Sequence, residues 1–75
     1  MKTELEKKLN KLPAYVNVGH TDFFLRIRKT DDYPDRKTIY WIIEYKDSCG
    51  NTLFDVWHSS LQAAVDTTLK EIKNL

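Results

Sequence analysis

The sequence has little of what usually shapes very small proteins: its 75 residues include one cysteine, two glycines and two prolines. One cysteine cannot close a disulfide within the chain, so the sequence excludes a disulfide-stapled fold and does not call for an oxidising compartment. The scarcity of glycine and proline, together with 41% hydrophobic residues, also excludes a low-complexity or intrinsically disordered chain. What remains is the composition of an ordinary folded domain.

Long apolar runs are missing as well. The first twelve residues read MKTELEKKLNKL, which is too charged for a signal peptide or a membrane span. An excess of one charge sign is also absent, since 12 basic and 11 acidic side chains give a net charge of +1. Such a balance does not predict binding to nucleic acids or membranes through long-range electrostatics. We therefore expect a cytoplasmic protein.

The length predicts a single domain over residues 1–75 with a thin core. A chain of this size buries only about 60% of the surface that it exposes when unfolded. Little stability is then left over for a deep, desolvated catalytic pocket. We expect a protein that is not an enzyme and needs no cofactor, and many folds of this size gain stability by self-association.

Two amphipathic helices are expected at the ends of the chain. In the first, Thr3 and Glu6 fit a capping box, leucines recur on one face, and Pro13 ends the run. In the second, Ser59 and Gln62 fit another capping box ahead of an apolar stripe with helical spacing. Both stripes need a surface against which to pack.

Between the helices, alternating polar and apolar residues predict strands over 23–29, 38–46 and 52–58, with 14–18 as a fourth candidate. Turns are expected at 19–22 and 47–51 and a polar loop at 30–37. The sequence therefore predicts an α+β fold of the order α-β-β-β(-β)-α. It is an open-faced sandwich in which two helices pack on one face of a three- to four-stranded antiparallel sheet.

Strand parity assigns side chains to the two faces of this sheet. The helix-covered face is expected to hold Phe23, Leu25, Ile27, Ile39, Trp41, Ile43, Tyr45, Phe54 and Val56. The opposite face would then expose apolar and basic side chains suited to a protein interface: Phe24, Arg26, Arg28, Tyr40, Ile42 and Trp57. Alternatives are cover by the chain's own first helix, stacking of single-stranded bases, and the opposite parity for the central strand, which would turn Trp41 and Tyr45 outward.

Cys49 and the two histidines invite a catalytic or metal-binding interpretation. His58 is separated from Cys49 by a strand, which leaves His20, in the neighbouring turn, as the better partner for the thiol. Both turns are short and lack a cleft, so we expect an incidental turn cysteine. These three residues match no zinc spacing, and Asp31, Asp32 and Asp35 lack the calcium-loop pattern.

A weaker candidate is an anion or nucleic-acid site at the other end of the sheet. Lys29, Arg36, Lys37 and His58 are expected near the start of the second helix, where exposed amides attract anions. The α-β-β-β-α order resembles the double-stranded RNA-binding domain, whose second helix begins with lysines that contact phosphates. The matching segment here, SSLQAAVDTTLK, has no lysine before Lys70, so those binding residues have no counterpart.

The function expected from these patterns is that of a non-enzymatic protein-interaction or regulatory module. Its partner would be another protein or a second copy of the chain, which would make it a homodimer, bound through the open sheet face. The alternative is a nucleic-acid-binding domain of double-stranded-RNA-binding-like topology. Neither a membrane nor a small-molecule substrate is indicated.

Overall fold

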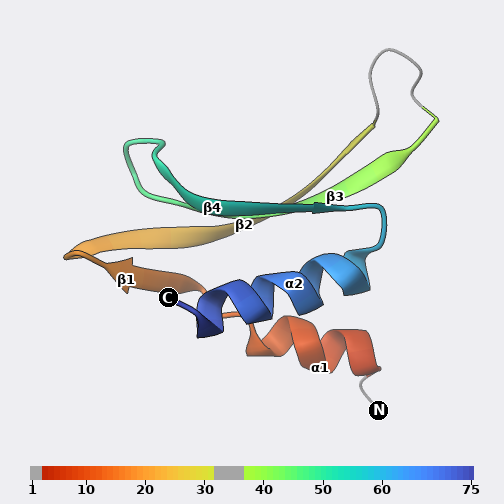
Figure 1. Ribbon diagram of the computed structural model, residues 1–75, viewed down its shortest axis with the longest axis horizontal. Helices are drawn as coiled ribbons and strands as arrows, with labels where there is room; N and C mark the ends of the chain where they lie inside the picture. Colours follow the sequence, from red (N-terminus) through yellow and green to blue (C-terminus); the bar gives the residue numbers. More distant parts are fainter. Residues whose placement is uncertain (1–2, 32–36) are drawn as a thin grey trace.

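The order of elements is α-β-β-β-β-α in the computed structural model, which describes residues 3–31 and 37–75 (Figure 1). The four strands form one antiparallel sheet in the sequential order β1-β2-β3-β4. This confirms the α+β fold and decides for four strands rather than three. The elements are α1 (Glu4–Lys11), β1 (Tyr15–Val18), β2 (Thr21–Asp31), β3 (Ile39–Lys46), β4 (Thr52–His58) and α2 (Leu61–Lys73).

Helix α1 starts and stops where the sequence predicts. The side chain of Thr3 caps it, since its Oγ1 accepts a hydrogen bond from the Glu6 amide at 3.2 Å. The helix ends at Lys11, two residues before Pro13, which cannot continue it. Acidic residues in the first turn and basic residues in the last complement the helix dipole.

The β1–β2 hairpin turns over only two residues, so β2 is longer than predicted. Gly19 and His20 have φ angles of 59° and 68°, the left-handed conformation that a tight two-residue hairpin requires at both central positions. Thr21 and Asp22, expected in the turn, instead begin β2 and pair with Val18 and Asn17. At its other end β2 continues to Asp31.

Helix α2 begins one residue later than its apparent capping box indicates. The cap is Ser60 rather than Ser59, and its Oγ accepts a hydrogen bond from the Ala63 amide at 3.3 Å. Either serine has the right chemistry for a cap. With Ser60 as the cap, Ala64, Val65 and Thr68 are buried and form the centre of the face that packs on the sheet.

Both helices lie on the same side of the sheet (Figure 1). Helix α2 packs on β3 and β4, and α1 lies beside α2, where Lys8 Nζ reaches Asp66 Oδ1 at 3.0 Å. The core is the layer between them, built around the buried residues Leu12, Ile43, Val56, Ala64 and Val65. Side chains from both helices and three strands pack around this cluster: Leu5, Leu9, Leu25, Trp41, Phe54, Leu61, Leu69 and Ile72.

The predicted strand parity is correct, but the helices cover less of the sheet than expected. Ile43, Tyr45 and Val56 are buried on the helix side, whereas Ile27 and Ile39 on that side are 40% and 47% exposed. The 13 residues of α2 span about 20 Å, and the 11 residues of β2 span about 36 Å. The far ends of β2 and β3 therefore extend past the helix and rise away from it (Figure 1).

Candidate protein-interaction surface

The surface of interest is the sheet face opposite the helices, called the outer face below. The pairing register places on it, in neighbouring positions, Tyr15 of β1, Phe24, Arg26 and Arg28 of β2, Tyr40, Ile42, Glu44 and Lys46 of β3, and Asp55 and Trp57 of β4. It therefore brings together all six residues that the sequence assigned to an interface. No helix of the described chain covers this face (Figure 1), so the alternative in which α1 crosses over it is wrong.

Exposed aromatic rings lie at two places on the outer face. Phe24 is 48% exposed and Trp57 is 52% exposed, although both are large apolar side chains. The Trp57 ring lies 6.4 Å from that of Tyr40, a tilted contact that fixes both rings. Trp57 is held further by its indole N–H, which donates to Asp55 Oδ2 at 3.0 Å.

Tyr15 belongs to this surface and was missed at the sequence level. It pairs with Phe24 across the β1–β2 hairpin, with ring centroids 6.4 Å apart, and is 56% exposed. The alternation of Tyr15 and Asn17 with two valines is the signal that could have placed it there. The same alternation predicts a candidate strand over 14–18, but the face that Tyr15 takes follows only from the pairing of that strand with β2.

Ile42 corrects one expectation about the outer face. The sequence analysis expected it to be uncovered and to anchor a partner, but it is fully buried. It pairs with Arg28 on one side and Trp57 on the other, so these larger side chains cover it without help from a helix. Ile42 therefore supports the surface from beneath.

Glu44 is the second buried residue of the outer face, with 3% of its surface exposed. Its carboxylate is compensated by two cations: Arg28 Nε lies 3.3 Å from Oε1, and Lys46 Nζ lies 3.9 Å from Oε2. A buried charge is tolerated only when it is paired in this way. Because Arg28 donates through Nε and is half exposed, the guanidinium is oriented by Glu44 while remaining open to solvent.

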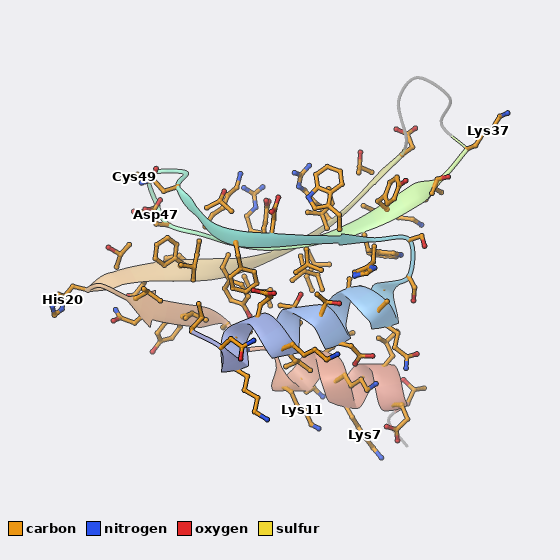
Figure 2. The ribbon with its side chains drawn as sticks, in the orientation of Figure 1. Lys7, Lys11, His20, Lys37, Asp47 and Cys49 are labelled. Carbon is orange, nitrogen blue, oxygen red and sulfur yellow. The ribbon has the colours of Figure 1, made fainter. Side chains whose placement is uncertain are left out.

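Of the basic residues proposed for an anion site, the three that the structure describes, Lys29, Lys37 and His58, do not form one group. Lys29 and His58 flank Trp41 on the helix side: Lys29 Nζ is 5.1 Å from the centre of the Trp41 ring, and His58 Nε2 is 3.1 Å from Thr67 Oγ1. An open hollow of about 390 Å³ adjoins Lys29 and is lined by Thr30, Asp31 and Ile39. Lys37 points outward at the far tip of the sheet (Figure 2). Arg36 lies outside the described residues, as do Asp32 and Asp35.

The segment around Cys49 is an exposed turn whose hydrogen bonds converge on Asp47 (Figure 2). Its Oδ1 accepts from the amides of Cys49 and Asn51 at 2.9 and 2.8 Å, and Oδ2 accepts from Asn51 Nδ2. The side-chain bond from Asn51 is the main reason that the pKa of Asp47 is lowered, and these backbone amides add to the effect. His20 lies at the tip of the other hairpin (Figure 2).

Residues 3–31 and 37–75 contain no group of three or more acidic, histidine or cysteine side chains that could hold a metal ion. Within the same ranges, neither helix is long and apolar enough to cross a bilayer. Comparison with known proteins found no matching family model, no similar curated protein and no similar solved structure.

Proposed function

We propose that this chain is a non-enzymatic protein-interaction module that binds a second copy of itself through the outer face of its sheet. The observation that carries the proposal is the aromatic surface of Tyr15, Phe24, Tyr40 and Trp57, which lies on a face without a helix. Pairs of exposed and half-buried aromatic rings with arginine nearby are typical of protein interfaces.

The charges of the outer face favour a protein over a polyanion as the partner. Three cations, Arg26, Arg28 and Lys46, share the face with three carboxylates, Asp22, Glu44 and Asp55. Two of the cations are already engaged with Glu44. A nucleic acid would meet little net positive charge here, whereas a surface of mixed sign suits a partner that carries the same mixture.

The size of the face favours self-association. The four strands contain 4, 11, 8 and 7 residues. At about 4.8 Å between strands and about 3.3 Å per residue, strands of this average length give a footprint near 20 by 25 Å before side-chain relief is counted. That can supply a large part of the roughly 800 Å² that each partner contributes to a standard interface. Packing two such faces would also give the marginal stability of a 75-residue chain a second apolar layer.

Sedimentation equilibrium over a wide concentration range, in moderate salt, tests the proposal. We expect the wild-type chain to be a dimer, and we expect Trp57→Lys and Tyr40→Glu to be monomers because each places a charge among the aromatic rings. The matched control is Ile39→Lys. Ile39 is apolar and about as exposed as Trp57, and it directly precedes Tyr40 in β3, on the opposite face of the sheet. This control should leave the dimer intact.

A wild-type chain that stays monomeric at millimolar concentration would refute the proposal, as would outer-face variants with the mass of the wild type. In either case the nucleic-acid alternative would be tested with duplex RNA at about 50 and 200 mM salt. Phosphate contacts would make that affinity fall steeply between the two concentrations.

A further inference from the structure

Two rows of side chains cross the outer face from β2 to β4, and each row has unlike ends. In the first row Arg26, Glu44 and Asp55 are register partners, so a cation lies at the β2 end and a carboxylate at the β4 end. In the second row the order is Arg28, Ile42 and Trp57, with a cation again on β2 and an aromatic ring on β4.

This polarity distinguishes between the ways in which two copies can face each other. Two identical sheets packed face to face are related by a two-fold axis lying between them. If the axis runs along β3, then β2 of each copy lies over β4 of the other, and β1 of each extends past the edge of the other sheet. If the axis runs across the strands, each strand lies over its own counterpart.

We infer that the two copies are related by an axis along β3, so that Arg26 of each faces Asp55 of the other and Arg28 of each faces Trp57 of the other. This inference rests on the proposed self-association. It produces one kind of salt bridge and one kind of contact between a guanidinium and an indole ring, and the symmetry forms each of them twice. A guanidinium over tryptophan is the best of the cation–π pairs.

The axis across the strands gives the opposite result. It would place Arg26 against Arg26 or Arg28 of the second copy, and Asp55 against Asp55 or Trp57. Like charges brought together at a desolvated interface repel each other and oppose association. Packed sheets are usually rotated by about 30° relative to each other, and this rotation does not change which strands face each other near the centre of the interface.

Arg28 and Trp57 are already ordered within the single chain. Arg28 is oriented by the buried Glu44 through a 3.3 Å bond from its Nε. Trp57 is fixed by its bond to Asp55 and by its contact with Tyr40. Groups that are already ordered lose less conformational entropy on binding, which raises affinity.

A charge-exchange experiment tests the inference. The dimer dissociation constant is measured by sedimentation for Arg26→Asp, Asp55→Arg and the double variant with both changes in one chain. We expect each single variant to weaken the dimer at least tenfold, because both symmetric pairs become like-charged. The double variant should return to within about threefold of the wild type, because opposite charges meet again.

Arg26 and Asp55 both neighbour Glu44, so reversing their charges can also change the stability of the single chain. Circular dichroism and thermal unfolding of the same changes in a Trp57→Lys background, which is expected to be monomeric, measure that effect separately from association. If a reversed variant does not fold, the neutral changes Arg26→Gln and Asp55→Asn replace it. In the arrangement inferred here they weaken the dimer, whereas an axis across the strands predicts that they strengthen it.

Each result has one interpretation. A dimer whose dissociation constant is unchanged or lowered by the single variants would overturn the orientation and leave self-association standing. A double variant as weak as the two single effects combined would overturn it as well. A monomeric wild-type chain would remove both the orientation and the proposed function.

Discussion

Tyr45 links the sheet to the segment that follows α1, and its hydroxyl sits where an ionised form is poorly tolerated. The side chain is fully buried, and Oη donates to the Pro13 carbonyl at 2.9 Å. Burial raises the pKa of Tyr45 to about 12 from its ordinary value of 10.0, because the phenolate would lose its hydration. The neutral hydroxyl therefore stabilises the fold up to about pH 10, and this contribution is lost as the pH rises through 12.

Tyr45→Phe is expected to lower the free energy of unfolding by about 1 kcal/mol at pH 7, since one net hydrogen bond is lost. Above pH 10 the difference in the free energy of unfolding between the wild type and Tyr45→Phe should narrow or reverse, because ionisation destabilises only the chain that keeps the hydroxyl. Urea unfolding at pH 7, 10 and 11.5 measures this. Tyr15→Phe, at an exposed tyrosine, is the control and should change little at any pH. A gap between wild type and Tyr45→Phe that stays constant with pH would contradict the assignment.

Residue by residue, sequence reasoning predicted the face of a side chain better than its burial. Alternation placed Ile42 and Glu44 on the outer face, as the register confirms. Their burial could not be read from the pattern, because it depends on which large side chains lie beside them on neighbouring strands. For Ile42 those neighbours are Arg28 and Trp57, and that set is known only once the register is known.

The bounds of the helices and strands agree with the sequence prediction where the local pattern is strong. They differ from it where two neighbouring residues fit the same pattern. The strands and both helices lie close to the predicted segments because alternation and helical spacing persist over several residues. The start of α2 moved by one residue because Ser59 and Ser60 are chemically equivalent caps. Packing against the sheet decides between them, and a local pattern does not contain that information.

The cap assignment makes a paired prediction about α2. Ser60→Ala is expected to destabilise the protein by about 1 kcal/mol, because it removes the side-chain acceptor of the Ala63 amide. Ser59→Ala should change stability by no more than a few tenths, since Ser59 precedes the cap. Chemical denaturation of both variants measures the difference. Equal effects, or a larger effect at Ser59, would show that the helix begins earlier.

At the scale of the whole molecule, self-association should make stability depend on concentration. Only folded chains associate into the dimer, so mass action raises the apparent stability of the fold as the protein concentration increases. We expect the thermal midpoint to rise by several degrees over a hundredfold increase in concentration. It should stay constant for Trp57→Lys over the same range, and calorimetry distinguishes the two. A concentration-independent midpoint for the wild type would contradict the dimer.

The centre of strand β3 is buried on both of its faces, since Ile42 and Glu44 support the outer face while Ile43 and Tyr45 belong to the helix side. Four consecutive residues thus support the outer face and the core in alternation. A substitution that remodels the outer face at Ile42 or Glu44 also disturbs the backbone that positions the core. The outer face therefore cannot change at the centre of β3 independently of the fold, and substitutions that spare the core are accessible mainly in the flanking strands β2 and β4.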